Sequence, residues 1–542
     1  MDMLTLVRES REMLEDTLKQ ANIFILLLCT VVSTFYIFKL YSLHSDDIGI
    51  RRRFANKFFR LVRKIPYVSK EIYKTKSMVY KSIHEDLNAA QPTSAYITAI
   101  PAKGESFDSL MGYLDSYENM KSDKEDVACY KRGRQSGAVF CYQSDPEELN
   151  IYLDIFKKFA YSNPLWPKCY PGIRRMESEV IRMSCTMLHG DSNSCGTITT
   201  GGTMSILLAC LSHRNKAMKE GILFPEMIIP TSAHAAFTKA AEVFRIKVKK
   251  IQLDSEFKVD LKKMESAINK NTCMLVGSAP NFPFGTVDDI EEIAKLGLRY
   301  DIPVHVDACL GGFLIPFLDD MDKPKFDFLI PGVSSISADT HKYGLAPKGS
   351  SVVLFRNRDL LHNQYFCDTD WQGGIYASAT LEGSRSGLNI ALCWAALLFQ
   401  GRETYQKNAE DIRRCTRQLR DGIKQIDGLR VMGASDVCIA SFTSDLIDIN
   451  LVHSELTKKE WHLTALQFPS GIHLMLTKLH TQPGVIEELL KDLRLVVEAV
   501  KSCPNQKLEG TAAIYGMAQR IPDRSLVQEV SHCYLDAVFA AP

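Results

Sequence analysis

The sequence predicts an α/β fold, with helices on both faces of a mostly parallel sheet, followed by a smaller α+β domain. Between residues 195 and 340, short apolar runs of strand length alternate with segments whose apolar residues recur at helical spacing. This alternation is typical of parallel strands joined by helices. From about residue 386 a long helical segment is followed by short strands with helices between them, which indicates a second domain.

The individual elements follow from these patterns. The strands expected in the large domain are Thr197–Thr199, Met227–Ile229, Val248–Leu253, Met274–Gly277, Val304–Val306 and Ile336–Ala338. Its expected helices include Arg174–Leu188, Met204–Leu211, Leu261–Asn269 and Asp288–Tyr300. Before them, residues 106–160 are mostly helical in pattern. In the smaller domain we expect the helix Ile390–Arg420 and strands near Arg430–Met432, Val437–Ser441 and Ile472–Leu476.

Composition narrows the class of protein. At 542 residues the chain is too long for one core, so two or three domains are expected. Lys and Arg number 65 against 64 Asp and Glu, and this balance argues against nucleic acid as the main partner. The 15 cysteines form no C-x-x-C pair, which favours free thiols in a reducing compartment over disulfides or a metal site.

The amino-terminal region predicts a membrane anchor. Residues 21–38 carry no charge, and with an extension to Leu43 they are long enough to span a bilayer. The alternatives are a buried core helix or a cleaved signal peptide, although acidic residues precede the run. Basic residues follow it, which places the rest of the chain on the cytosolic side and residues 1–20 in the lumen. They are Lys39, Arg51, Arg52, Arg53, Lys57, Arg60, Arg63 and Lys64.

One lysine stands out from the rest. Lys342 follows an expected strand end and is flanked by Gly344 and Pro347, so it lies on a turn. Most lysines in such a place are ordinary surface residues. Upstream, however, Asp307 ends another apolar run, and a Gly201–Gly202–Thr203 turn separates a strand from a helix. An amine, a strand-end acid and open backbone N–H groups are what pyridoxal phosphate needs for attachment, for its ring nitrogen and for its phosphate.

These positions are expected to converge. Gly202, His234, Asp307 and Lys342 all follow expected strands. Ligands of parallel sheets bind beyond the carboxyl ends of the strands. The sequence therefore predicts one cofactor site at that edge of the sheet.

Six longer runs extend this pattern. They are TTGGT (199–203), SAHAAF (232–237), HVDACLGGF (305–313), SISADTHKYG (335–344), DTDWQGGIYAS (368–378) and AIYGMAQ (513–519). These runs resemble the sphingosine-1-phosphate lyase family, within the decarboxylase-like branch of fold-type I pyridoxal-phosphate enzymes. The resemblance covers roughly Tyr96 to the carboxyl terminus and implies a seven-stranded-type sheet.

The resemblance implies a role for each matching position. Lys342 would attach pyridoxal 5'-phosphate, Asp307 would pair with its ring nitrogen, and His234 would stack on the ring. Lys348 would reach the substrate phosphate. The cofactor phosphate would be held by Gly201, Gly202, Thr203 and His341, with help from Gly373 and Gly374 in the 371–374 loop of a second subunit.

The resemblance also implies a reaction and a setting. A phosphorylated sphingoid base would be cleaved between C2 and C3 to a long-chain aldehyde and phosphoethanolamine. The enzyme would be a homodimer with shared active sites, anchored in the endoplasmic reticulum membrane.

Five positions differ from the family pattern. They are Phe140 for Tyr, Trp166 for His, Met204 for Glu, Phe284 for His and Leu345 for Tyr. In the family the first two help to bind the substrate phosphate. Each hydrogen bond lost to a charged group costs roughly 1.5–3 kcal/mol, so weaker substrate binding is expected.

Two alternatives therefore stay open. One is a pyridoxal-phosphate enzyme acting on another amine, such as an amino-acid decarboxylase with Arg385 holding the carboxylate, although Arg385 also fits a structural role. The other is a weakly active or inactive relative of the lyases. The domains that we expect are 1–20, the anchor 21–43, a basic connector 44–95, a helical arm 96–172, the cofactor domain 173–385 and a small domain 386–542.

Overall fold

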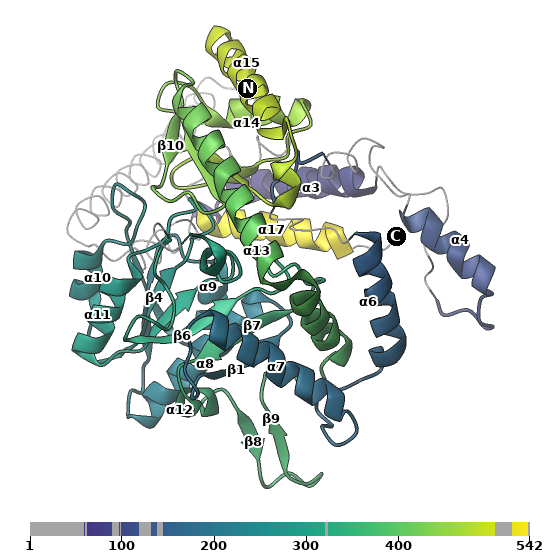
Figure 1. The fold of residues 1–542 in the computed structure, drawn as a ribbon. Coiled ribbons are helices and arrows are strands. Elements are labelled where there is room, and N and C mark those ends of the chain that lie inside the picture. Colours follow the sequence, from purple (N-terminus) through teal and green to yellow (C-terminus); the bar gives the residue numbers. More distant parts are fainter. Residues whose placement is uncertain are drawn as a thin grey trace, which may run out of the picture. The chain divides into compact units, whose positions relative to one another are not determined.

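The computed structural model describes residues 59, 62–88, 97, 99–118, 132–137, 145–319, 323–503 and 523–539 (Figure 1). The chain divides into two compact units, Met1–Lys81 with Pro522–Leu535, and Ser82–Ile521 with Asp536–Pro542. The predicted anchor and the run 513–519 lie outside the described residues. Within the described part of the chain, no helix is both long and apolar enough to cross a membrane.

The first unit contains most of two helices, α3 (Pro66–Asn88) and α17 (Arg524–Phe539). Charged side chains connect its two segments. Arg63 Nε donates to Asp523 Oδ2 at 2.6 Å, and Lys76 Nζ lies 3.0 Å from Glu529 Oε2. The Asp523 side chain is only 9% exposed, so its pairing with Arg63 is the better shielded of the two.

The second unit is built on a seven-stranded sheet in the order β1-β7-β6-β5-β4-β2-β3, in which only β7 runs antiparallel to the rest. The predicted mostly parallel sheet is therefore confirmed. All six strands expected in this domain are present, and β7 is the one that the sequence analysis missed. Their bounds are β1 Cys195–Thr199, β2 Glu226–Pro230, β3 Lys247–Ile251, β4 Thr272–Ser278, β5 Val304–Asp307, β6 Val333–Ala338 and β7 Ser351–Phe355.

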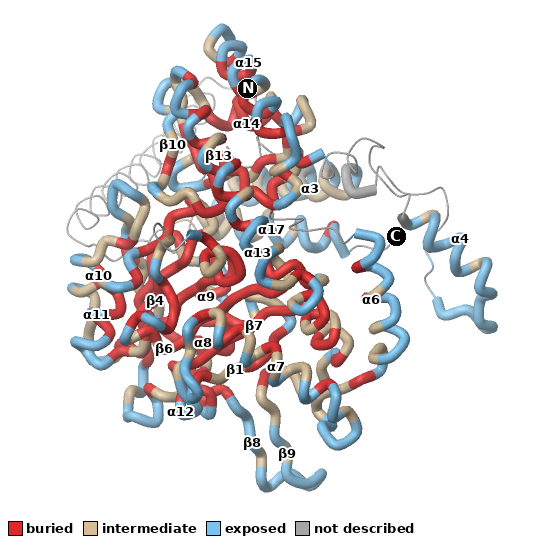
Figure 2. The backbone as a smooth tube through the Cα atoms, in the orientation of Figure 1, coloured by how far each residue is buried: buried red, intermediate tan, exposed pale blue. Residues whose placement is uncertain are grey.

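Helices cover both faces of this sheet. Met227 and Ile229 of β2 pack under α8 (Gly202–Lys219) and α9 (Ala235–Phe244), whereas Ile228 between them faces the opposite core. The inner strands are accordingly buried along most of their length, as Figure 2 shows, and β4 is buried at every residue. The edge strand β3 carries three lysines, which discourage pairing with another chain. The remaining helices of this domain are α6 Pro146–Phe159, α7 Pro171–Met187, α10 Leu261–Ala267, α11 Ile290–Tyr300 and α12 Arg358–His362, with the 3-10 helix Ile315–Phe317.

The smaller domain has an antiparallel sheet in the order β10-β11-β13-β12. The long helix α13 (Gly387–Lys424) leads into it and is kinked at Gly401, where φ is 63°. The strands are β10 Arg430–Met432, β11 Ile439–Thr443, β12 Thr464–Leu466 and β13 Gly471–Met475; the helices are α14 Ile449–Lys458, α15 Val485–Ser502 and the 3-10 helix Lys478–Thr481. Outside both domains' cores, α4 (Phe107–Glu118) and the hairpin β8 (Phe366–Asp368) to β9 (Tyr376–Ser378) are largely exposed (Figure 2).

Four of the described histidines are fully buried in the two cores and kept neutral by their surroundings. Burial lowers the pKa of two of them to about 3 and of the other two to about 4. The first pair is His213 and His305 in the large domain, and the second is His473 and His480 in the small one. Burial has the opposite effect on an acid, since it raises the pKa of Asp288 to about 6.

We expect the protein to lose stability as the pH falls from about 6.5 to about 4. An unfolded histidine binds its proton near pH 6.5, well before the folded ones do, so the unfolded state gains protons first over this range. Asp288 acts in the opposite sense, because its contribution is present at low pH and lost as the pH rises through about 6. Four histidines outweigh one aspartate. Thermal melting measured across this pH range checks the sign.

A pair of variants isolates the cause. His480→Gln should flatten the dependence of melting temperature on pH, because it removes one of the buried groups. The exposed His532→Gln should leave the slope unchanged. A slope that is equal in all three proteins would contradict the assignment.

Candidate active site

Three neighbouring parallel strands end in one row of polar residues. The register pairs Ser278 of β4 with Asp307 of β5, and Asp307 with Ser337 of β6. Because parallel strands end at the same edge, these side chains border one crevice. The amino terminus of α8, beginning after Gly201, adds its free N–H groups at the same edge.

The turn that carries Lys342 is fixed from two sides. Ala346 N donates to Thr340 O at 3.1 Å, which closes the turn. Tyr405 of α13 donates to Gly344 O at 2.7 Å, and Tyr343 donates to Leu476 O at 2.6 Å, beside β13 of the small domain. A side chain at Gly344 would place its Cβ 2.4 Å from Thr340 O, so only glycine fits there.

A cavity of about 600 Å³ lies at this edge of the sheet. It is lined by seven of the predicted site residues, namely Gly201, Gly202, Thr203, His234, Asp307, His341 and Lys342. The remaining lining is largely apolar, apart from Thr200, Ser278 and Asp339, and includes Met475 from the small domain. A larger groove of about 820 Å³ opens at the opposite ends of the strands, and none of the predicted residues lines it.

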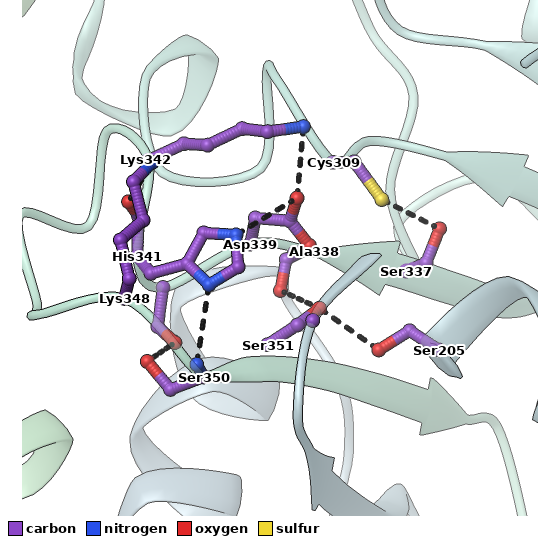
Figure 3. A network of polar contacts seen from close by, with 12 residues as sticks. Ser205, Cys309, Ser337, Ala338, Asp339, His341, Lys342, Lys348, Ser350 and Ser351 are labelled. Atoms are coloured by element: carbon purple, nitrogen blue, oxygen red, sulfur yellow. Dashed lines mark hydrogen bonds and ion pairs between the residues drawn. The ribbon is translucent and has the colours of Figure 1, made fainter. Parts of the chain in front are cut away.

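Three predicted residues do not line the cavity. Lys348 is exposed and its Nζ lies 3.4 Å from His341 O, at the back of the Lys342 turn (Figure 3). Gly373 and Gly374 lie in the β8–β9 hairpin, where Gly374 N donates to Trp371 O. Their place at the cofactor site of a second subunit stays a prediction.

Lys342 is paired with a buried carboxylate that the sequence analysis did not single out. Its Nζ lies 2.8 Å from Asp339 Oδ2, and the Asp339 side chain is 1% exposed (Figure 3). Burial alone lowers the pKa of Lys342, but the Asp339 carboxylate outweighs this effect and holds the pKa above its usual range. The amine is therefore protonated in this arrangement, and it becomes a nucleophile only after its proton moves, with Asp339 in place to accept it.

Both histidines of the cavity have defined roles for their ring nitrogens. His341 Nδ1 accepts from Gly349 N and Ser350 N, at 3.2 and 3.1 Å. Burial lowers the pKa of His341, so the neutral ring carries its proton on Nε2, which lies 3.7 Å from Asp339 Oδ2. His234 Nδ1 likewise accepts from Ala236 N at 3.2 Å, at the start of α9. Each ring thus leaves Nε2 for a ligand.

Asp307 is a buried acid without a cation. It is 7% exposed, and its side chain accepts from Cys309 N at 3.1 Å and Ser337 Oγ at 3.3 Å. Both bonds end on Oδ1. Among the described residues no basic nitrogen lies within ion-pair distance of Asp307. Lys342, the lysine of this cavity, is paired with Asp339 instead. A buried carboxylate of this kind favours a cationic ligand, such as a protonated pyridine nitrogen.

Two other buried polar atoms of the cavity have no hydrogen-bond partner. They are Asp339 Oδ1 and Ser278 Oγ. Unsatisfied buried groups are costly, and a polar ligand would satisfy them. Together with the lysine, the acid and the helix terminus, they fit bound pyridoxal phosphate.

Hydroxyl groups hold the glycine turn against the sheet. Thr199 Oγ1 lies 2.7 Å from Ser205 Oγ. Ser205 Oγ lies 2.8 Å from Ser351 Oγ, and Ser351 donates on to Ala338 O (Figure 3). The turn at Gly201 and Gly202 therefore lies close to the carboxylate of Asp339. A Cβ on Gly202 would lie 2.7 Å from both Asp339 carboxylate oxygens and 2.9 Å from Cys309 Sγ.

Arg385 is not available for a substrate carboxylate. Its two terminal nitrogens bind both oxygens of Glu177, at 2.7 and 3.1 Å, and Nη1 also donates to Ile198 O. Such a two-pronged pair is strongly oriented. Arg385 therefore has a structural role, in which it joins Glu177 to the backbone of Ile198.

The five positions that differ from the family pattern are scattered. Met204 lines the cavity. Phe284 is buried in a separate apolar cluster with Met432 and Leu466, and Leu345 is buried at a φ of 62°. Trp166 is 61% exposed, and Phe140 lies outside the described residues.

We expect Gly202→Ala to weaken binding of pyridoxal phosphate by about tenfold or more, because the new methyl group would displace Asp339 or the turn. Absorbance titration with the cofactor measures the dissociation constant. Gly172→Ala is the matched control, because its Cβ would enter open space. Equal affinities for both variants would show that the close approach is unimportant.

Comparisons with known proteins also point to a pyridoxal-phosphate-dependent enzyme. Residues 160–443 match the family described as "Pyridoxal-dependent decarboxylase conserved domain". A glutamate decarboxylase from Lactobacillus brevis, 18% identical with a TM-score of 0.64, shares the fold over 75% of this chain and 96% of its own.

More similar proteins share one description. The chain is 41% identical to the Drosophila melanogaster sphingosine-1-phosphate lyase, over 93% of this chain and 92% of that protein. It is 40% identical to the Rattus norvegicus sphingosine-1-phosphate lyase 1, over 94% and 89%. A solved structure of the Burkholderia pseudomallei sphingosine-1-phosphate lyase superposes with a TM-score of 0.73 at 36% identity, covering 84% of this chain and 99% of that one. The chain belongs to the sphingosine-1-phosphate lyase family of pyridoxal-phosphate-dependent enzymes.

Proposed function

We propose that this protein cleaves phosphorylated sphingoid bases between C2 and C3, giving a long-chain aldehyde and phosphoethanolamine. The observation that carries the proposal is the pairing of charges in the cavity. Lys342 is matched by Asp339, which leaves Asp307 as a second buried acid for a cofactor cation. Similarity to lyases over most of the chain supports the choice of substrate.

The chain's own groups have separable tasks in this reaction. Bound pyridoxal phosphate supplies an electron sink for the carbon–carbon cleavage. Asp307 would pair with the protonated ring nitrogen of the cofactor, and Gly202, Thr203 and His341 would hold its phosphate. Asp339 accepts the proton that Lys342 loses before its amine reacts. The apolar lining, including Phe282 and Met475, excludes water from the reacting centre.

An amino-acid decarboxylase is less well supported. Such an enzyme needs a cation for the substrate carboxylate, and Arg385 is occupied by Glu177. Among the described residues, Lys342 is the one lysine or arginine that lines the cavity, and it is paired with Asp339. We therefore favour cleavage of a phosphorylated amine.

We further propose a homodimer in which the β8–β9 hairpin completes the partner's cofactor site. Trp371 and Ile375 are 55% and 81% exposed on this hairpin, and apolar side chains exposed together on one hairpin suit a contact with another subunit. Gly373 and Gly374 would then approach the cofactor phosphate of the other subunit. Sedimentation of the purified protein as a monomer would contradict this proposal.

The amino terminus motivates a proposal for location. The uncharged run 21–38 and the basic residues after it suit a single span in the endoplasmic reticulum membrane, with the catalytic part in the cytosol. An anchor suits a substrate whose tail partitions into lipid. Protein lacking residues 1–43 should no longer sediment with membranes, and continued sedimentation would argue against the anchor.

The first test combines product and attachment. Wild-type protein should release aldehyde from a fluorescent phosphorylated sphingoid base, and Lys342→Ala should lose this activity because the cofactor has no amine to attach to. Borohydride reduction followed by peptide mapping should label Lys342. Lys348→Ala should keep the label and bind substrate less tightly if it holds the substrate phosphate. A label on another lysine would overturn the assignment, and carbon dioxide released from amino acids would favour the decarboxylase.

A second test concerns the altered positions. Restoring Trp166→His together with Phe140→Tyr should lower the KM for a phosphorylated sphingoid base by about tenfold or more, because each change returns a polar partner for the phosphate. The kinetics of the single and double variants measure this. Phe284→His, at a buried position outside the cavity, is the comparison, and it should not improve KM. Unchanged kinetics in the double variant would reject the interpretation.

A further inference from the structure

A continuous chain of buried polar groups runs behind the cofactor site to Asp307. His213 Nε2 of α8 lies 2.7 Å from Ser335 Oγ, which lies 2.8 Å from His305 Nδ1. His305 Nε2 lies 3.3 Å from Ser337 Oγ, and Ser337 donates to Asp307 Oδ1 at 3.3 Å. We call these four residues, His213, Ser335, His305 and Ser337, the histidine relay.

Strand register builds the relay. β5 and β6 are paired so that His305 lies opposite Ser335 and Asp307 lies opposite Ser337. Residues two apart on a strand share a face, so all four side chains point the same way. That face is covered by α8, which contributes His213.

The acid at the end fixes the direction of the hydrogen bonds. An ionised carboxylate only accepts hydrogen bonds, so the single hydroxyl proton of Ser337 is donated to Asp307. Its oxygen then accepts from His305 Nε2–H, and from the Cys309 thiol at 3.4 Å. Burial raises the pKa of Cys309 well above its usual range, so that thiol is a donor.

The same reasoning fixes which ring nitrogen carries the proton in both imidazoles. Burial keeps His305 neutral, with a pKa near 3, so with the proton on Nε2 its Nδ1 must accept from Ser335 Oγ–H. Ser335 in turn accepts from His213 Nε2–H. His213 Nδ1 is left as an acceptor without a donor, and that atom is indeed buried and without a hydrogen-bond partner.

We propose that the histidine relay is a positioning device, which holds Asp307 as an oriented anion through neutral donors and so presents Oδ2 to the ring nitrogen of the cofactor. A cation behind Asp307 would compete with that nitrogen for its charge. Neutral donors orient the carboxylate without competing. Phe237 and Phe355 pack edge-on against His305 and His213 and keep water out of the relay. This inference rests on the cofactor site of the proposed function, not on the identity of the substrate.

The first measurement reads the relay directly. Long-range proton–nitrogen NMR of protein labelled with ¹⁵N-histidine, prepared without cofactor, reports which ring nitrogen carries the proton. We expect His213 and His305 both to be neutral with the proton on Nε2. The loss of one signal set in His305→Gln or in His213→Gln assigns them. A proton on Nδ1 of His305 in the wild-type protein overturns the proposal, whether or not the enzyme cleaves sphingoid phosphates.

The second measurement separates positioning from simple packing. His305→Phe should weaken binding of pyridoxal phosphate by about tenfold and shift the visible absorption of the bound cofactor, because Asp307 loses its support. His305→Gln can place an N–H near the position of Nε2, so it should recover most of the affinity and the wild-type spectrum. A glutamine variant as impaired as the phenylalanine variant, or a phenylalanine variant that binds like wild type, overturns the proposal.

His480→Gln is the matched control for burial. This histidine is also fully buried and neutral, but it bonds Thr477 of the small domain and the backbone of Gln135 in the segment 132–137, away from Asp307. We expect it to lower the melting temperature and to leave cofactor affinity and spectrum unchanged. If it changes them as much as His305→Phe does, the effect is one of global stability and the relay has no special role.

Discussion

The in-register ending of β4, β5 and β6 is the constraint on which the rest of the site depends. It sets Ser278, Asp307 and Ser337 in one row, and it places the turn with Lys342 directly after that row. A shift of one residue in any of these pairs would turn the acid to the other face of the sheet. The apolar packing of both faces, by α8 and α9 on one side and α11 on the other, fixes the register.

Two buried acids divide the charge of the cavity between them. Asp339 is matched by Lys342 at 2.8 Å, and Asp307 is matched by no basic side chain in the described part of the chain. Burying a carboxylate without a cationic partner costs free energy. A cationic ring nitrogen beside Asp307 would lower that cost, so binding of the cofactor is favoured. Hence the pocket favours its cofactor by charge as well as by shape.

The sequence was enough to predict those site residues and strands that depend on a local pattern of residues. Asp307 and Lys342 follow apolar runs, and parallel strands must end together, so their convergence could be predicted. Asp339 and Ser278 were missed, although each is a polar residue at a strand end. His213 and Met475 could not be found in this way, because the rotation of α8 and the approach of the small domain decide what they touch. The strand β7 was missed because it is a short apolar run after a turn, and such runs have no periodicity that separates strand from helix.

The departures from the family pattern are unevenly distributed, and this bears on what has changed in the protein. Asp307, His341, Lys342 and the glycine turn are present and line one cavity, and of the four altered positions that the structure describes only Met204 is among its walls. Phe284 and Leu345 are buried outside that cavity, where they alter packing instead of ligand contacts. Trp166 is exposed and does not line the cavity. Among the described positions, the residues that would hold the cofactor and most of the altered residues therefore lie in different parts of the structure, so the altered residues can change without disturbing the cofactor cavity.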